Sequence, residues 1–232
     1  MKEKIAAVVP AAGIGKRLGA QTNKPFACIN NKPLILWTLE TLEGMSEIHE
    51  IIPVLKKADI TPAADLFKRH NITKVRKIAS GGKERQDSVY RGLQLIDDRT
   101  CLVMIHDGVR PLIEERIIRK ALREFKNCDG VVVGVPVKDT IKKTNGDVVT
   151  ETLKRHALWA IQTPQIFTYA SLYRAYEKAM QDAYYATDDA ALVEQYGGTV
   201  RVIEGSDTNI KITVPEDISI AEILLSKRDA KR

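Results

Sequence analysis

Two glycines and three cations follow the first apolar segment of the chain. Gly13 and Gly15 come directly after the apolar residues 5–10, and the cations Lys16, Arg17 and Lys24 come next. Backbone N–H groups in a glycine-rich turn, together with the N-terminus of a helix, favour bound anions. Three cations are more positive charge than the pyrophosphate of a dinucleotide requires. The segment therefore predicts a site for a polyanion, with a nucleoside triphosphate as the preferred ligand.

Other glycine-rich motifs fit this segment less well. A dinucleotide-binding turn needs G-x-G-x-x-G, and here Gly19 comes one residue late, while the second apolar run ends in Lys56-Lys57 without an acid for a ribose. A P-loop needs Ser or Thr after its lysine, and Arg17 stands there. A reductase that uses NADP remains open, as does a purely structural turn with surface cations.

A second glycine-rich turn covers residues 80–88, with Gly81, Gly82, Arg85 and Ser88. It follows another expected strand and leads into an expected helix. Its backbone amides and the hydroxyl of Ser88 could contact a base or a ribose. A plain loop with a helix start is the alternative, and the turn alone favours that alternative.

A third candidate, residues 106–111, reads His-Asp-Gly-Val-Arg-Pro after an apolar run. Asp107 at the end of a strand could hold Mg²⁺ or a substrate hydroxyl, and Arg110 could bind a phosphate. His106 is interpreted as a hydrogen-bonding support, because no acid is placed to orient it as a base. An Asp–Arg pair that only closes the turn is the structural alternative.

Further along the chain, Lys138, Thr140, Arg155 and Lys211 are scattered polar residues that, taken alone, resemble solvated surface. Trp159 and residues 163–165 are interpreted as a packed aromatic and a turn. The four histidines and three cysteines lack the spacing of a zinc site, and an odd cysteine count favours reduced thiols. No residues suggest covalent catalysis.

These loops need strands and helices to position them, and apolar runs alternate with helix-periodic segments. Continuous apolar runs such as Leu102–Ile105 are typical of strands that are buried on both faces. The alternation predicts an α/β fold with a mostly parallel twisted sheet flanked by helices, which binds its ligand at the C-terminal ends of the strands. Strands are expected at 4–10, 49–55, 73–79, 100–106 and 129–136, and helices at 33–44, 59–69, 85–97, 114–127, 169–182, 187–196 and 215–227.

One polar stretch interrupts this alternation. Asn145-Gly146 is the preferred pair for a type I′ hairpin turn, and its flanks are too polar to enter the core. We therefore expect a projecting β-hairpin arm at approximately 137–157. An isolated two-stranded ribbon is marginal in water, so a homodimer formed through the arm is one interpretation. A surface hairpin without a partner is the other, and the sequence favours neither.

Composition sets the remaining expectations. The net charge is +6, and the last six residues contribute half of it, so the rest of the chain is only mildly basic and nucleic acid is not an expected partner. No apolar run is long enough to cross a bilayer, and the N-terminus lacks the features of a signal peptide. We expect a cytoplasmic protein with one domain over residues 1–232.

Taken together, the motifs resemble the 2-C-methyl-D-erythritol 4-phosphate cytidylyltransferases of the non-mevalonate isoprenoid pathway. The resemblance covers nearly the whole chain in the right order, which makes it more specific than any single loop. The segments that carry it are Pro10–Arg17, Gly81–Val89, His106–Pro111, Pro136–Thr140, Leu158–Gln165, Thr187–Ala190 and Asn209–Thr213.

The resemblance implies a nucleotidyltransferase fold, a homodimer with interlocking arms, and transfer of CMP from CTP to the sugar-alcohol phosphate with Mg²⁺. By position, the residues expected to act in catalysis are Arg17, Lys24, Arg155 and Lys211. Those expected to bind CTP are Ala11, Ala12, Gly13, Gly15, Lys24, Gly81, Gly82, Arg85 and Ser88. Those expected to bind methylerythritol phosphate are Asp107, Arg110, Thr140, Arg155 and Lys211, with Thr140 and Arg155 donated by the neighbouring subunit. The Mg²⁺ is expected to be held mainly by the phosphates of CTP, with Asp107 as a further ligand.

Two positions depart from the family pattern. Pro25 follows Lys24 where the family often has glutamine, and Val109 stands where a smaller residue is usual. Ribitol-5-phosphate cytidylyltransferases can carry valine there, and they are the alternative assignment. They usually open with Ala-Gly-Gly, whereas this chain has Ala11-Ala12-Gly13, and residues 163–165 also favour the methylerythritol enzyme.

Overall fold

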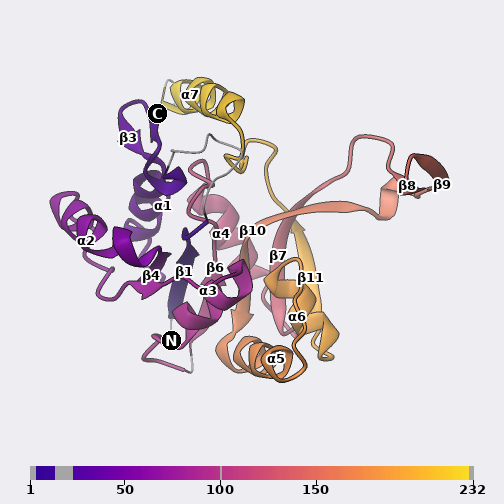
Figure 1. Cartoon of the computed structure of the whole chain (residues 1–232), viewed down its shortest axis with the longest axis horizontal. Helices are drawn as coiled ribbons and strands as arrows, with labels where there is room; N and C mark the ends of the chain where they lie inside the picture. Colours follow the sequence, from indigo (N-terminus) through magenta and orange to yellow (C-terminus); the bar gives the residue numbers. More distant parts are fainter. Residues whose placement is uncertain (1–3, 14–22, 100, 230–232) are drawn as a thin grey trace.

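A seven-stranded mixed sheet forms the centre of the protein (Figure 1). The structure is a computed structural model, and it describes residues 4–13, 23–99 and 101–229. Four neighbouring strand pairs are parallel, and β10 lies antiparallel between β6 and β7. This confirms the expected mostly parallel α/β fold. In spatial order the strands are β11 (Val200–Glu204), β7 (Gly130–Pro136), β10 (Trp159–Thr168), β6 (Leu102–Ile105), β1 (Ile5–Pro10), β4 (Ile48–Leu55) and β5 (Ala79–Ser80).

The sheet corrects three expectations about strands. The strand expected at 73–79 is wrong, because only Ala79 and Ser80 pair with β4, although Lys74 accepts a hydrogen bond from the backbone of Ile51. Lys74, Arg76 and Lys77 interrupt the apolar pattern there, and Val75 and Ile78 are only partly buried against the core. Residues 163–165 were expected to form a turn, but they lie within strand β10. The strand continues through them with a bulge and a cis Thr163–Pro164 bond. β11 was not expected, because it is a largely exposed edge strand.

All seven expected helices are present, with ends that differ by a few residues. The helix expected at 187–196 begins at Asp189, because the carboxylate of Asp188 accepts a hydrogen bond from the backbone N–H of Ala191 and caps it. The helices are α1 (Leu34–Glu43), α2 (Ile60–Arg69), α3 (Arg85–Leu93), α4 (Glu115–Arg123), α5 (Tyr169–Gln181), α6 (Asp189–Gln195) and α7 (Pro215–Asp229).

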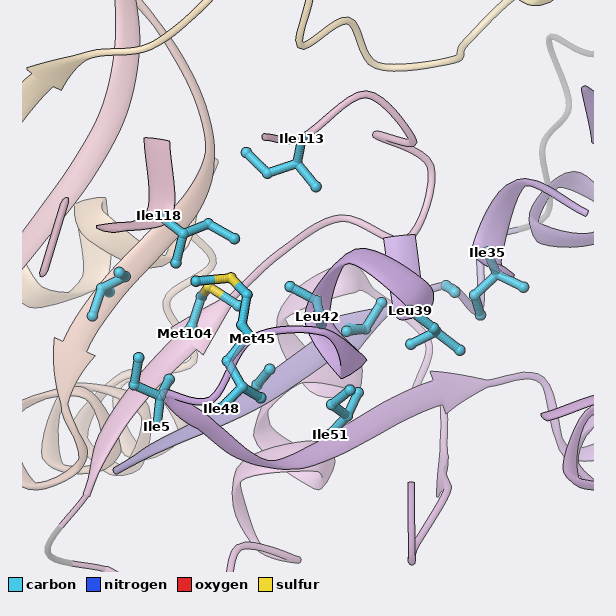
Figure 2. Packing of buried hydrophobic residues seen from close by; sticks show 14 of the residues in the cluster. Ile5, Ile35, Leu39, Leu42, Met45, Ile48, Ile51, Met104, Ile113 and Ile118 are labelled. Atoms are coloured by element: carbon cyan, nitrogen blue, oxygen red, sulfur yellow. The ribbon is translucent and has the colours of Figure 1, made fainter. Parts of the chain in front are cut away.

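Each face of the sheet has its own apolar core. Successive residues of β1 alternate between them, because side chains of a strand point to opposite faces: Ala7 and Val9 pack with α1, α2 and α4, whereas Ala6 and Val8 pack with α3, α5 and α6. Figure 2 shows the first core, where Leu39 and Leu42 of α1 lie over the strands. The sheet is thus covered on both faces, and its strand ends are left to form a site.

A smaller third core fixes the last part of the chain. Helix α7 packs against the short pair β2 (Cys28–Ile29) and β3 (Lys32–Pro33), and Ile212 is completely buried in this cluster. The backbone N–H of Ile212 also donates to the carbonyl of Val109, at 2.9 Å. These contacts bring residue 211 to the end of β6, although 104 positions separate it from Asp107 in the sequence.

The expected hairpin projects away from the sheet (Figure 1). It consists of β8 (Lys142–Asn145) and β9 (Val148–Thr152), which pair antiparallel, and every residue of both strands is exposed. The turn differs from the expected type I′, because Asn145 pairs with Val148 and Gly146 alone of the turn residues has a positive φ, of 61°. In the described part of the chain no helix is long and apolar enough to cross a membrane.

Candidate functional site

Three loops meet where the parallel strands end. The backbone N–H of Ala11 donates to the carbonyl of Val54, and that of Gly81 donates to Leu55, which joins the ends of β1, β4 and β5. On the other side of β1, the N–H of Gly108 donates to the carbonyl of Pro10. The first, second and third candidate segments therefore lie at one edge of the sheet, as the α/β pattern predicts.

A cleft of about 690 Å³ lies at this edge. Nine of the sequence-predicted site residues line it: Ala11, Ala12, Gly13, Lys24, Gly82, Arg85, Ser88, Asp107 and Lys211. Lys56 and Lys83 also line it and add positive charge. Four of its lining residues are thus lysines and one is an arginine, which suits an anionic ligand. Gly15 and Arg17 lie outside the described residues.

Small residues are required in the wall of the cleft. A Cβ atom at Gly81 would lie 2.3 Å from the Cβ of Ala12, which is closer than two carbons can approach. The hydroxyl of Ser88 stabilises the conformation of the same loop, since it accepts a hydrogen bond from the backbone N–H of Gly82 at 3.0 Å and donates one to the carbonyl of Glu84 at 3.1 Å. These hydrogen bonds hold the loop in a fixed shape beside the cleft.

Asp107 is the centre of an ionic cluster at the cleft. Its Oδ1 lies 3.3 Å from Nε of Arg85, and its Oδ2 lies 2.8 Å from Nζ of Lys211 and 3.7 Å from Nε of Arg110. Burial alone would raise the pKa of Asp107, but the charges of Arg85 and Lys211 outweigh burial and hold this pKa well below its ordinary value. Asp107 is therefore a carboxylate at every physiological pH, and both its oxygens already have cationic partners.

Arg110 is placed differently from the sequence expectation of a phosphate clamp. Its side chain is buried, does not line the cleft, and donates from Nη1 to the backbone carbonyl of Asn209 at 2.7 Å. Arg110 thus joins the loop after β6 to the segment that carries Lys211. Thr140 and Arg155 lie on the exposed arm, where Nη1 of Arg155 donates to the carbonyl of Lys138, so this chain does not bring them to its own cleft.

His106 is a support, as the sequence indicated. It is completely buried, with Nε2 3.3 Å from the carbonyl of Arg110 and Nδ1 3.1 Å from the hydroxyl of Thr163. A carbonyl can only accept, so Nε2 carries the proton and Nδ1 accepts from Thr163. The same hydroxyl accepts from the backbone N–H of Asp107 at 3.0 Å, which fixes the loop. Burial lowers the pKa of His106 to about 4.

This buried imidazole predicts a loss of stability in acid. The unfolded chain takes up a proton near pH 6.5, whereas the folded protein does not until about pH 4, so the free energy of unfolding falls as the pH drops through that window. Between pH 7 and pH 5, His106 is expected to remove about 2 kcal/mol. Urea titrations at both pH values should show this loss in the wild type and a smaller one in His106→Gln. Equal losses in the two proteins would contradict the assignment.

For several residues at the site, nothing in the sequence indicated the role that they have in the structure. Thr163 lies in a segment that was expected to be a turn. Lys56 lines the cleft directly after β4, but it belongs to none of the sequence motifs. Asp189 lies in the segment Thr187–Ala190 that carries the family resemblance, but no role was expected for it, and its Oδ2 lies 2.8 Å from Nη2 of Arg85. A charged residue next to a helix cap is common, so nothing local distinguishes Asp189.

Comparisons with known proteins show the family of the chain. A family model described as IspD, 2-C-methyl-D-erythritol 4-phosphate cytidylyltransferase, matches residues 5–227. The chain belongs to this family. Proteins of that description from Syntrophus aciditrophicus and Clostridioides difficile are similar to it, with 41% identity over all of both chains and 45% identity over 96% of this chain and 94% of the relative.

Solved structures show the same likeness in three dimensions. The 4-diphosphocytidyl-2C-methyl-D-erythritol synthase of Anaerococcus prevotii superposes with a TM-score of 0.86 at 32% identity, and 97% of each chain is covered. The enzyme of Thermus thermophilus superposes with a TM-score of 0.78 at 28% identity. The activity of the chain is therefore that of IspD, a cytidylyltransferase of the non-mevalonate isoprenoid pathway.

Proposed function

We propose that the cleft at the ends of β1, β5 and β6 is where CMP passes from CTP to 2-C-methyl-D-erythritol 4-phosphate. The observation that carries this proposal is the convergence of three segments far apart in the sequence, Ala11–Gly13, Gly81–Ser88 and Asp107, on one cleft lined by five cations. The first two segments would hold the nucleotide, and the Asp107 cluster would hold the acceptor.

The reaction needs charge neutralisation more than proton transfer. The phosphate of the acceptor is already an anion, and one of its oxygens forms a bond to the α-phosphorus of CTP while the bond from that phosphorus to the β-phosphate oxygen breaks. Pyrophosphate leaves with the electron pair, so no base is required. Lys24, and by resemblance Arg17, would stabilise the charge that builds up at the α-phosphate.

A divalent cation fits this cleft only as a partner of the triphosphate. Within the described residues no three carboxylate, histidine or cysteine side chains gather as a metal site. Both oxygens of Asp107 face cations, so this residue is a poor direct ligand. Mg²⁺ would be held by the phosphates of CTP and would supply further neutralisation of their charge. The protein residues would bind and orient the complex.

The arm would complete the acceptor site of a second subunit. Val148 and Val149 on the hairpin are 63% and 54% exposed, an unusual place for valine on a ribbon that has no core of its own. Near the base of the arm a groove exposes Ile161 and Val202. A homodimer would cover both apolar surfaces, and it would bring Thr140 and Arg155 from the arm of one subunit to the cleft of the other.

Exchange of the arm predicts complementation between two inactive variants. Lys24→Ala removes a residue of the cleft, and Arg155→Ala removes a residue of the arm. In a mixed dimer one site carries both defects and the other carries neither, so a random mixture of co-expressed variants should regain about a quarter of wild-type activity, since half of its dimers are mixed. Mixtures no more active than the separate variants would place Arg155 in its own subunit's site or outside any site.

The direct test of the proposed reaction is the release of pyrophosphate. Purified protein is incubated with CTP, Mg²⁺ and methylerythritol phosphate, with ribitol 5-phosphate as the acceptor in a parallel assay. We expect rapid release with the first acceptor and little with the second. Preference for ribitol 5-phosphate would overturn the proposed acceptor, and no release with either would remove the proposal.

A further inference from the structure

We propose that Asp189 is a positioning residue of the acceptor site, which acts by holding Arg85 in the orientation that fixes the carboxylate of Asp107. The inference rests on the role proposed above for Asp107. Asp189 does not line the cleft and would not touch a substrate. Its effect passes through Arg85, which the family resemblance implied for CTP; the contacts of Arg85 with Asp107 and Asp189 assign it to the acceptor instead.

Asp189 is a buried carboxylate, and hydrogen bonds from two side chains offset the cost of its burial. It has no exposed surface, although it begins helix α6. One carboxylate oxygen lies 2.8 Å from Nη2 of Arg85, and the other accepts a hydrogen bond from the hydroxyl of Tyr176. A buried carboxylate without such partners would be costly. Both oxygens of Asp189 are thus committed to fixed positions inside the protein.

Arg85 connects this buried acid to the cleft. Its guanidinium points Nη2 at Asp189 and Nε at Asp107, 3.3 Å away. Because the group is planar and rigid, two acids on different nitrogen atoms determine its orientation. Burial opposes the charge of Arg85, but Asp189 and Asp107 together raise its pKa above the ordinary value, so it remains a cation. Without Asp189, the guanidinium could turn and pair with Asp107 alone.

Such a turn would change what Asp107 offers to a substrate. At present Asp107 shares its two oxygens between Arg85 and Lys211, which itself lines the cleft. A bidentate pair with Arg85 would compete with Lys211 and would occupy the oxygen directions that a substrate hydroxyl needs. Asp189 therefore keeps Asp107 and Lys211 available to the acceptor while it leaves the nucleotide side of the cleft untouched.

The test is a double-mutant cycle between Asp189→Asn and Arg85→Lys, read out as separate KM values for the two substrates. Asparagine keeps the shape of Asp189 but removes its charge. We expect Asp189→Asn to raise the KM for methylerythritol phosphate at least tenfold and to change the KM for CTP less than twofold. In the Arg85→Lys background, Asp189→Asn should change the KM for methylerythritol phosphate less than threefold, because the guanidinium that links Asp189 to Asp107 is no longer present.

Asp188→Asn is the matched control. It removes the same charge one position earlier, where the carboxylate caps α6 and accepts from Gln165 rather than from an arginine. Asparagine caps helices about as well as aspartate, so both KM values should stay within twofold of the wild type. If Asp189→Asn does not fold, Arg85→Lys alone must show the selective rise in the KM for the acceptor.

The outcomes separate this inference from the proposed function. Equal effects of Asp189→Asn in both backgrounds, or equal changes in the KM values of both substrates, would overturn the positioning role. If Asp107→Asn raises the KM for the acceptor and neither Asp189→Asn nor Arg85→Lys does, only the inference fails. If Asp107→Asn leaves that KM unchanged, the proposed acceptor site and the inference fail together.

Discussion

Replacing Lys24 with alanine is expected to lower kcat by about 100- to 1,000-fold, the effect of losing one charge-stabilising group in an active site. Lys24 lies in the short helical turn η2 (Lys24–Phe26) and lines the cleft at the end of β1. Its role in the proposed mechanism is to stabilise charge at the α-phosphate as the bond to pyrophosphate breaks. Charge that grows in the transition state affects turnover more than substrate binding.

The fold should survive this change. Pro25 is the buried residue of η2, and it stays in place when the lysine side chain is removed. Steady-state rates of pyrophosphate release, with a thermal unfolding curve of each protein, separate loss of catalysis from loss of structure. Lys227→Ala, on the exposed side of α7, is the control for the same truncation and should keep full activity. A Lys24→Ala protein with wild-type kcat would remove Lys24 from the mechanism.

Replacing Asp107 with asparagine is expected to raise the KM for methylerythritol phosphate by about 10- to 100-fold, since a hydrogen bond to a charged group contributes about 1.5–3 kcal/mol. The change also leaves Arg85, Lys211 and Arg110 without their shared carboxylate, so the three cations should move apart. The affinity for CTP should change little, because the nucleotide would contact the loops at Ala11–Gly13 and Gly81–Ser88.

Isothermal titration with CTP and initial rates at varied acceptor concentration test this separation. Asp97→Asn is a suitable control, because Asp97 also pairs with a lysine, Lys77, but its side chain is exposed and lies outside the cleft. It should leave both substrates unaffected. If Asp107→Asn weakens CTP binding as much as it weakens use of the acceptor, Asp107 serves the nucleotide and the two halves of the cleft must be reassigned.

The elements that sequence patterns predicted well are those with a local cause. Strand β6 is apolar on both faces, and α4 repeats apolar residues on one face, so each is recognisable without its neighbours. β10 was missed because Pro164 and polar residues interrupt its pattern, while the bulge that accommodates them is fixed by β6 and β7. β11 was missed although its valines and isoleucine favour a strand, because it is short and most of its residues are exposed at the edge of the sheet.

The residues of the site also fall into two groups, those that the sequence predicts and those that only the tertiary fold brings together. The loops at Ala11–Gly13 and Asp107 could be predicted because each follows an apolar strand, and the loop at Gly81–Ser88 because two adjacent glycines precede a helix. The partners that orient them come from distant segments: Thr163 lies 57 positions from His106, and Asp189 lies 104 positions from Arg85. The groups that can perform chemistry are therefore recognisable in the sequence, but the groups that hold them depend on the tertiary fold.

The most direct test of the central claim is a crystal structure of the protein with CTP and Mg²⁺. The account predicts the cytosine and ribose against the loops at Ala11–Gly13 and Gly81–Ser88, the triphosphate beside Lys24, and an open space between the α-phosphate and Asp107 for the acceptor. CTP bound outside this cleft, or with its phosphates directed away from Lys24, would contradict it.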